Sequence, residues 1–318
     1  MLHFYNSNDT IQSIIEQSFV SGNNEYGQLA LQHNKYQREL VSSFDFKDIK
    51  KISSSYHTFI LTSDGSVFAS GRNDTGQLGI GSNIDSNILV NIVLPEKIID
   101  LSVGENHSLL LSQTGNVYVS GDNTFGQMGN INSSDVPIVN TQLISFNKVI
   151  AKSRKSFFIS DTGNVFCCGQ FESNIIDPIQ ITANILDEHI IDVSGYRDRF
   201  FFLSKSGNVF FSEDVKSLIQ IKSNILDTQN ILKIAAGINH VSFLTDSGNV
   251  YNEHFQLIHN DIQKIASEYN YSLYLKTDGN VYLDNQLFVD SADVFDIFTG
   301  YDCSFINPLN YFSSAKAI

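Results

Sequence analysis

Residues 104–129 read GENHSLLLSQTGNVYVSGDNTFGQMG, and this stretch carries the pattern from which the fold can be predicted. The apolar run 108–111 is separated from a second apolar run, 117–119, by a short polar segment that contains Gly115. Tight hairpin turns need a positive φ angle, which glycine adopts without steric cost. The stretch therefore predicts two antiparallel strands joined by a tight turn.

The same hairpin signature recurs along the chain. In each copy a turn residue precedes Gly, which is followed by Asn or Ser and then by Val. The turn glycines are Gly65, Gly115, Gly163, Gly207, Gly248 and Gly279. Subtracting successive positions gives spacings of 50, 48, 44, 41 and 31 residues. A period of roughly 40 to 50 residues is typical of propellers and solenoids.

A further apolar segment precedes each hairpin. Its copies begin at Ile49, Ile98, Val149, Ile190, Ile231, Ile262 and Val294. Small residues recur near its end, as in residues 231–237, ILKIAAG. Such residues suit a strand that lies close to its equivalents around a central axis.

The last copy of this segment indicates how the repeats close. Residues 294–307 lack a glycine turn, whereas residues 19–29, at the other end of the chain, align with residues 68–78. We therefore predict an all-β fold: a seven-bladed β-propeller of four-stranded blades, closed by pairing an N-terminal half-repeat with the C-terminal half-repeat. Closure removes exposed sheet edges, whereas an open solenoid carries capping repeats instead of a split one.

We expect one domain over residues 1–318. Its repeats are predicted at about 49–97, 98–147, 148–189, 190–230, 231–261 and 262–293, with a split blade formed by 17–48 plus 294–307.

Composition excludes several classes of protein. The 318 residues include 34 Asp and Glu against 20 Lys and Arg, a net charge of −14, so direct DNA binding is not expected. No apolar run is long enough to span a bilayer, and the N-terminus lacks the features of a signal peptide. The 3 Cys cannot form a complete disulfide framework. We expect an intracellular monomer without membrane contact, either cytoplasmic or nuclear.

The fuller units resemble the repeat of the regulator of chromosome condensation family. The resemblance rests on Gly-x-x-His-Ser at 104–108, the glycine turn, Gly-x-Asn at 121–123 and the Gly-Gln-Met-Gly loop 126–129. It extends from about residue 17 to 307. The loop recurs at 76–79, is blurred at 27–30 and is lost from residue 169 onward. Where the family has Trp, this chain has Ser21, Ser70, Ser120 and Cys168. WD-type and kelch blades fit poorly, because the chain has no Trp and no Gly-Gly doublet.

The resemblance implies several functions. Family members include an exchange factor for a small nuclear GTPase, ubiquitin-ligase adaptors, a plant ultraviolet sensor and scaffolds. Light sensing uses clustered Trp, and chromatin binding uses a basic arm; this chain has neither. We expect a non-enzymatic protein–protein interaction scaffold. The alternative is a guanine nucleotide exchange factor for a Ras-like small GTPase, although no long inserted loop stands out.

The sequence does not indicate an enzyme, a cofactor or a metal site. His57, His107 and His240 occupy one repeat position in different blades, which favours a structural role, with the imidazole capping backbone groups of the turn. Cys167 and Cys168 are adjacent and fit small core residues on opposite faces of a strand. No phosphate-binding loop or nucleophile elbow is present.

One group of residues suggests a binding surface. The turns between first and second strands share one face of a propeller, so neighbouring blades bring basic residues together there. These are Lys152, Arg154 and Lys155 from the third blade and Arg197 and Arg199 from the fourth. Aromatic surface is added by Tyr196, Tyr269, Tyr271 and Tyr301. We predict that this sector binds an acidic patch on a protein partner, such as a small GTPase. The alternative is a set of ordinary solvated turns.

Overall fold

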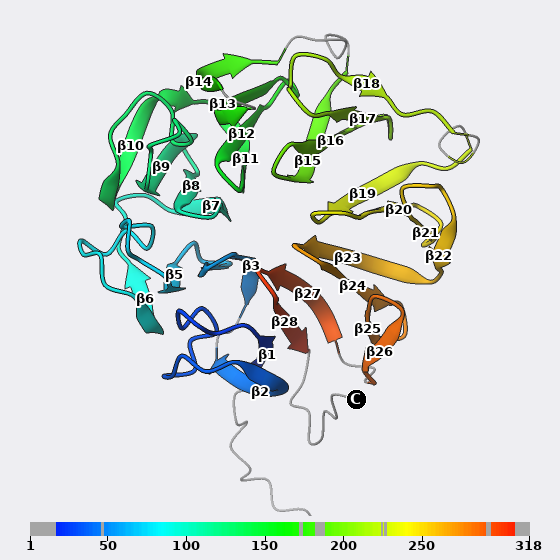
Figure 1. Ribbon diagram of the computed structural model, residues 1–318, viewed down its shortest axis with the longest axis horizontal. Coiled ribbons are helices and arrows are strands. Elements are labelled where there is room, and N and C mark those ends of the chain that lie inside the picture. Colours follow the sequence, from blue (N-terminus) through cyan, green and yellow to red (C-terminus); the bar gives the residue numbers. More distant parts are fainter. Residues whose placement is uncertain are drawn as a thin grey trace, which may run out of the picture.

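Seven four-stranded sheets stand like blades around a central axis in the computed structural model (Figure 1). The structure describes residues 17–45, 48–171, 174–181, 188–223, 225, 228–290 and 294–308. The first strand of each blade lines the axis. These strands are β3 (Ile49–Ser54), β7 (Ile98–Val103), β11 (Phe146–Lys152), β15 (Ile190–Tyr196), β19 (Ile231–Ala236), β23 (Ile262–Glu268) and β27 (Val294–Gly300).

The other strands follow outward from the axis. The second strands are β4 (His57–Thr62), β8 (His107–Ser112), β12 (Lys155–Ser160), β16 (Arg199–Ser204), β20 (Val241–Thr245), β24 (Tyr271–Lys276) and β28 (Cys303–Pro308). The third strands are β5 (Val67–Gly71), β9 (Asn116–Gly121), β13 (Val165–Phe171), β17 (Val209–Ser212), β21 (Val250–Tyr251), β25 (Val281–Leu283) and β1 (Gln17–Gly22). The outer strands are β6 (Ser86–Ile92), β10 (Ser134–Ile144), β14 (Asn174–Gln180), β18 (Ile219–Gln220), β22 (Leu257–His259), β26 (Gln286–Val289) and β2 (Gln37–Asp45).

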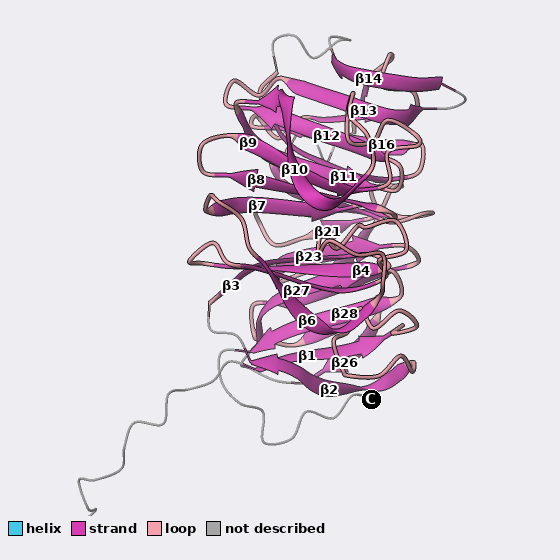
Figure 2. Ribbon diagram, turned by 90° about the vertical axis from the view of Figure 1, so that its left-hand side faces the viewer, coloured by secondary structure: helices cyan, strands magenta, loops and turns pink. Residues whose placement is uncertain are grey.

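Blades 1 to 6 are numbered from β3 onward, and the split blade holds β27, β28, β1 and β2. Seen from the side, the strands run through the thickness of a disc and the connections lie on its two faces (Figure 2). β11 begins at Phe146, so it crosses the boundary expected between residues 147 and 148. Phe146 extends this strand because its ring packs on Phe158, 5.3 Å away between centroids.

The glycine turns form as predicted. All six glycines have a positive φ, for example 92° at Gly65 and 79° at Gly248. In the first of these turns Gly65 N donates to Thr62 O at 2.9 Å, which closes the link between β4 and β5. A side chain at such a φ would be strained, so the recurrence of glycine follows from turn geometry.

The ring closes by hydrogen bonding between the two ends of the described chain. β1 pairs antiparallel with β28, with Val20 opposite Phe305, and the sheet order is β2-β1-β28-β27. The seven-bladed fold and its split closure are therefore confirmed. The ends of the predicted domain, residues 1–16 and 309–318, lie outside the described residues.

The hydrophobic core lies between neighbouring blades. The second strands β4 and β8 are buried along their whole length, because they are sandwiched between the adjacent sheets. Cys167 packs with Phe157 and Phe200 between blades 3 and 4, whereas Cys168 packs with Met128 between blades 2 and 3. The two cysteines thus occupy opposite faces of β13, as predicted.

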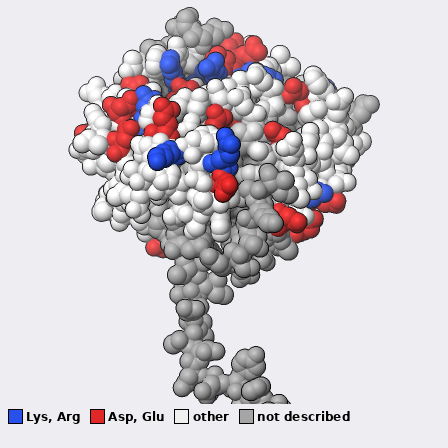
Figure 3. All heavy atoms as spheres, turned by 60° about the horizontal axis from the view of Figure 1, so that its bottom comes forward, with Lys and Arg blue, Asp and Glu red and all other residues white. Residues whose placement is uncertain are grey.

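Within the described part of the chain, no helix has the length and apolar character that a membrane crossing needs. Acidic and basic side chains are interspersed in small groups on the side that carries β2 and β26 (Figure 3). Most of the surface seen there is uncharged.

Candidate functional site

The two faces of the disc differ in what they present. We call the face formed by the turns between first and second strands the turn face; its turns are residues 55–56, 104–106, 153–154, 197–198, 237–240, 269–270 and 301–302. The opposite face carries the glycine turns and is called the hairpin face. The loops between third and fourth strands also reach the turn face, because strands alternate in direction.

The glycine–glutamine loops of the turn face join the split blade, blade 1 and blade 2 each to the next blade. Asn73 organises the loop of blade 1, since its side-chain oxygen accepts from Leu78 N at 2.9 Å. Leu78 is fully buried between blades 1 and 2. Asn123 with Met128, and Asn24 with Leu29, repeat this arrangement at 2.7 Å and 2.8 Å.

The residues that replace the family's Trp hold these loops. Ser120 Oγ donates to Gln77 O at 3.2 Å, across the joint between blades 1 and 2. Ser70 and Cys168 make the equivalent contacts to Gln28 O and Gln127 O, at 3.4 Å each. At the position where the family has Trp, this chain therefore has a small hydrogen-bond donor, and the loop backbone of the preceding blade packs directly against that donor.

Two of the repeated histidines link blades. His57 Nε2 lies 2.7 Å from Ser108 Oγ, and that hydroxyl donates to Gln77 O at 2.8 Å. Because the serine proton goes to the carbonyl, the serine oxygen must accept from a protonated Nε2. His107 repeats this with Ser156 at 2.9 Å.

The partners of these histidines differ from the expected ones. We predicted caps on backbone groups of the same turn, but His57 and His107 donate to a side chain of the next blade, which close blade packing brings within reach. Burial lowers the pKa of both imidazoles to about 3, so they are neutral. His240 is half-buried and bonds to the backbone of Tyr271 in the next blade.

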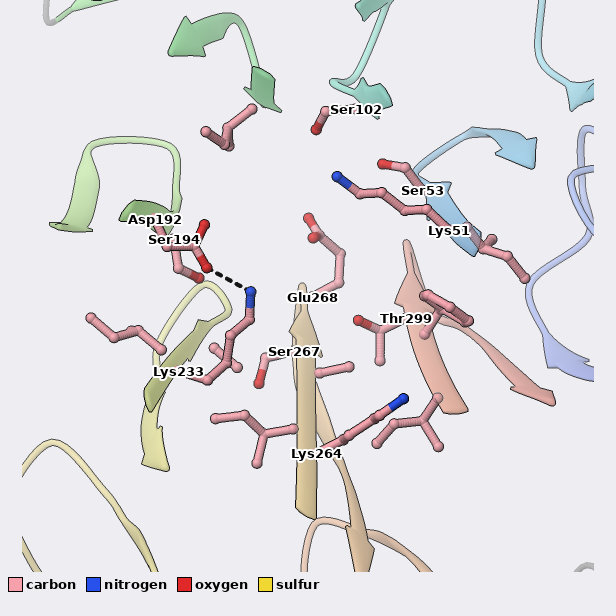
Figure 4. Close-up of a pocket in the computed structure, with 18 of the residues that line it drawn as sticks. Lys51, Ser53, Ser102, Asp192, Ser194, Lys233, Lys264, Ser267, Glu268 and Thr299 are labelled. Carbon is pink, nitrogen blue, oxygen red and sulfur yellow. Dashed lines mark hydrogen bonds and ion pairs between the residues drawn. The ribbon is translucent and has the colours of Figure 1, made fainter. Parts of the chain in front are cut away.

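A ring of charges lines the channel near the hairpin face. The third residue of every inner strand is charged: Lys51, Asp100, Lys148, Asp192, Lys233, Lys264 and Asp296. We call this set the charge ring. Six of its members, all but Asp100, line a cavity of about 540 Å³ (Figure 4). The charge ring was not predicted from the sequence, although its members stand at one fixed position in each inner strand.

Ion pairs connect neighbouring blades within the charge ring. They join Lys51 to Asp100 at 2.7 Å, Lys148 and Lys233 to Asp192 at 2.7 Å and 2.6 Å, and Lys264 to Asp296 at 3.0 Å. Burial of Asp192 raises its pKa, but the ammonium groups of Lys233 and Lys148 outweigh this and hold the pKa well below its usual range. Asp192 of blade 4 is therefore an ionised carboxylate that pairs with one lysine from each neighbouring blade, blade 3 and blade 5.

The channel is obstructed toward the turn face. Glu268 projects from the end of β23 into the middle of the cavity (Figure 4). It forms an ion pair with Lys152, which comes from blade 3 on the other side of the axis. Tyr196 OH donates to Glu105 at 3.4 Å. The predicted site residues Lys152 and Tyr196 thus bond to carboxylates of the protein itself.

The predicted basic sector is smaller than expected. Lys155 is 4% exposed, and its ammonium donates to Arg197 O at 2.6 Å and to Asp198 at 2.8 Å. Arg154 and Arg197 are exposed, and Arg199 is half-buried. The prediction overestimated the exposed positive charge. The ammonium group of Lys152 is bound by Glu268, and that of Lys155 is bound by groups of the neighbouring blade.

A line of tyrosine rings crosses the turn face. The rings follow one another in the order Tyr26, Tyr56, Tyr301, Tyr269 and Tyr196. The centroids of successive rings are 5.8, 4.4, 4.3 and 5.9 Å apart. We call these five residues the tyrosine row. Tyr196 is 6% exposed and supports the row from below, whereas the other four are half-buried.

The ends of the tyrosine row are occupied by arginines. The guanidinium of Arg72 lies 5.4 Å from the Tyr26 ring, and that of Arg197 lies 5.8 Å from the Tyr196 ring. The sequence pointed to Tyr196, Tyr269 and Tyr301 but missed Tyr26 and Tyr56. Tyr271 was expected at this rim; its hydroxyl instead donates to Cys303 O, which keeps it out of the row.

Among the described residues, no group of three His, Cys, Asp or Glu side chains could hold a metal ion. The features of the turn face are the tyrosine row and the obstructed end of the channel.

Comparison with known proteins identifies the repeat. The regulator of chromosome condensation repeat matches residues 64–111 and 98–127. Human WBSCR16 is similar in structure, with a TM-score of 0.76, 17% identity, and coverage of 93% of this chain and 100% of that one. Prp20p of Saccharomyces cerevisiae has a TM-score of 0.78 and 16% identity, with coverage of 98% and 97%. That protein's structure was described with its binding to Gsp1p and histones. These identities show the fold alone.

Proposed function

We propose that this protein, a divergent member of the regulator of chromosome condensation repeat family, is a non-enzymatic scaffold that binds a protein partner through its turn face. The tyrosine row is the observation that carries this proposal. Tyrosine and arginine are enriched at the energetically dominant positions of protein interfaces.

The row is suited to recognition because it is already ordered. Tyr56, Tyr269 and Tyr301 are half-buried and pack against one another as tilted ring pairs, so binding costs them little side-chain entropy. Their hydroxyl groups provide hydrogen-bond capacity beside apolar rings. The 3 Cys are all unpaired and buried, which agrees with action inside the cell.

Site-specific photo-crosslinking tests the proposal. A photo-reactive phenylalanine analogue is placed at Tyr301 on the turn face or at Ser206 on the hairpin face, in the native host. We expect the Tyr301 probe to capture a discrete protein and the Ser206 probe to miss it. Equal capture by both probes contradicts the proposal.

Truncating the row gives the matched measurement. Tyr56→Ala is expected to weaken binding of the captured protein by about 2 kcal/mol. Leu257→Ala serves as control, because Leu257 is also apolar and is 55% exposed on the outer strand β22. If both variants bind as well as the wild type, the row is not the contact surface.

A second candidate is exchange activity on a Ras-like small GTPase. The likeness to Prp20p, which extends over 98% of this chain, favours it, since that protein was described with its binding to Gsp1p. Release of a fluorescent guanine nucleotide from a panel of Ras-like GTPases separates the two functions. A scaffold leaves the release rate unchanged, whereas an exchange factor accelerates it for one GTPase.

A further inference from the structure

A polar cavity of about 310 Å³ opens between blades 3 and 4. Its walls include Glu105, Arg154, Lys155, Gln170, Arg197 and Asp198. The cavity lies beside the end of the tyrosine row, because Arg197 follows Tyr196 in the chain and its guanidinium faces that ring.

The cavity exists because this joint departs from the repeat. Lys155 occupies the position of His57 and His107, and Phe200 replaces the serine that these histidines bind. The Lys155 ammonium therefore bonds to Arg197 O and Asp198 instead, and lies 5.1 Å from the Phe171 ring and 5.5 Å from the Phe200 ring. A buried cation thus forms one wall and fixes the turn that carries Arg197.

The two arginines of the cavity have donors to spare. Arg154 lies over the Phe125 ring at 4.3 Å, and its polar contacts with described residues are long, 3.4 Å to Gln170 and 3.8 Å to Glu105. Across the described ranges, Arg197 has no carboxylate within ion-pair distance. By contrast, the charge ring closes its pairs at 2.6 to 3.0 Å. The planar guanidinium presents several donors in a geometry that matches a carboxylate.

We propose that this cavity binds the carboxylate of an acidic side chain on the protein partner, with Arg154 and Arg197 as its ligands. The proposal rests on the scaffold function and specifies the chemistry of the partner. Arg154, Arg197 and Lys155 supply three positive charges, whereas Glu105 and Asp198 supply two negative ones. A net charge of one suits a monoanion, since the two carboxylates repel a phosphate dianion more strongly than a carboxylate.

Nuclear magnetic resonance of the arginine side chains tests this subsite on the whole protein. The probe is the peptide acetyl-Glu-Tyr-Glu-amide, compared with acetyl-Gln-Tyr-Gln-amide and with inorganic phosphate. We expect the acidic peptide to shift the Nε resonances of Arg154 and Arg197 saturably, and the neutral peptide to leave them unchanged. Binding is expected to weaken as salt rises.

Substitutions assign the effect to the two arginines. Arg154→Gln and Arg197→Gln are each expected to weaken binding of the acidic peptide about tenfold, which corresponds to about 1.4 kcal/mol. Lys205→Gln is the matched control, because Lys205 is an exposed cation of blade 4 on the hairpin face and should leave binding unchanged.

Four results overturn the proposal: no binding of the acidic peptide, an equal response to the neutral peptide, binding that survives both arginine substitutions, or tighter binding of phosphate than of the acidic peptide. The crosslinking from Tyr301 is independent of this subsite. If capture at Tyr301 persists while the peptide fails to bind, the carboxylate subsite is wrong and the scaffold function stands.

Discussion

Blades 1 and 2 and the split blade differ from blades 4 to 6 in how they hold their neighbours. Their outer strands β6, β10 and β2 have 7, 11 and 9 residues, whereas β18, β22 and β26 have 2, 3 and 4. In the first group a loop residue seals the joint to the next blade. Those residues are Leu29, Leu78 and Met128, all fully buried.

Within the described residues, the joints after blades 3 and 4 contain no glycine–glutamine loop and are filled by aromatic rings. Phe157 and Phe200 lie 4.8 Å apart between blades 3 and 4. Phe243 of blade 5 stacks on Phe255 at 5.7 Å and meets Phe201 of blade 4 at 6.0 Å. We call these the aromatic joints, and the joints with Leu29, Leu78 and Met128 the loop-sealed joints.

The inner strands, not the outer loops, define the ring. Every blade keeps an inner strand of 6 or 7 residues, while the means of sealing a joint varies. Hydrogen-bonded loops and packed rings are thus alternative ways to bury the same interface. The two kinds of joint are therefore expected to lose different amounts of stability when one of their side chains is truncated.

Removing a ring from an aromatic joint is expected to have the largest effect. Phe200→Ala should lower the free energy of unfolding by about 4 kcal/mol, because the buried ring leaves a cavity against Phe157. Phe200→Leu, which keeps much of the volume, should cost distinctly less. Chemical denaturation measures both, and equal losses from the two variants would show that ring volume does not hold the joint.

A loop-sealed joint should be somewhat less sensitive. Leu78→Ala is expected to cost about 3 kcal/mol, since the buried side chain fills the joint between blades 1 and 2. Ile84→Ala in the same loop is the control; Ile84 is 75% exposed and should change stability by no more than about 0.5 kcal/mol. The comparison fails if Leu78→Ala costs more than Phe200→Ala.

Acid should weaken the two loop-sealed joints that contain histidine. The folded pKa of His57 and His107 is about 3, below the usual 6.5, so the unfolded state binds protons first as pH falls from 6.5. Stability is fully present above that pH and declines below it, by about 2 kcal/mol per histidine between pH 7 and pH 5.

The matched measurement is the pH dependence of unfolding in His107→Asn. This variant should lose less stability than the wild type over the same interval. An unchanged slope would mean that His107 takes up its proton without unfolding. The joint between blades 3 and 4 lacks this sensitivity, because Lys155 stands where the histidine would be.

The smallest effect is expected at the serines that hold the loops. Ser120→Ala removes the hydrogen bond to Gln77 O and should cost about 1 kcal/mol. Ser217→Ala on an exposed turn of blade 4 should be close to neutral. A loss at Ser120 no larger than at Ser217 would indicate that the Ser120 hydrogen bond does not hold the loop, and that the contacts of Ser108, Asn73 and Leu78 suffice.

The fold could be predicted because a repeated glycine turn is a local feature. The tight turn at Gly115 requires a positive φ, which glycine adopts without strain, so the recurrence of glycine reports on backbone geometry directly. Even the split blade was visible, since residues 19–29 repeat residues 68–78.

The site was harder to predict, because side-chain partners depend on distances across the ring. Lys152 and Glu268 are 116 positions apart, and alignment assigns them to blades without showing that their side chains meet over the axis. Tyr26 and Tyr56 come from a loop and a degenerate turn, so repeat position did not mark them. The tyrosine row forms only once the split blade is placed beside blade 1.

The charge ring has a consequence that depends on parity. Two signs can alternate around a circle only if the number of members is even, and this circle has seven. Two like charges must therefore be neighbours somewhere, and they are Lys233 and Lys264. Each turns away from the other, toward Asp192 and Asp296 respectively. An even-bladed relative could alternate completely; in this molecule the odd blade number requires one like-charged pair, and the sequence places that pair between blades 5 and 6.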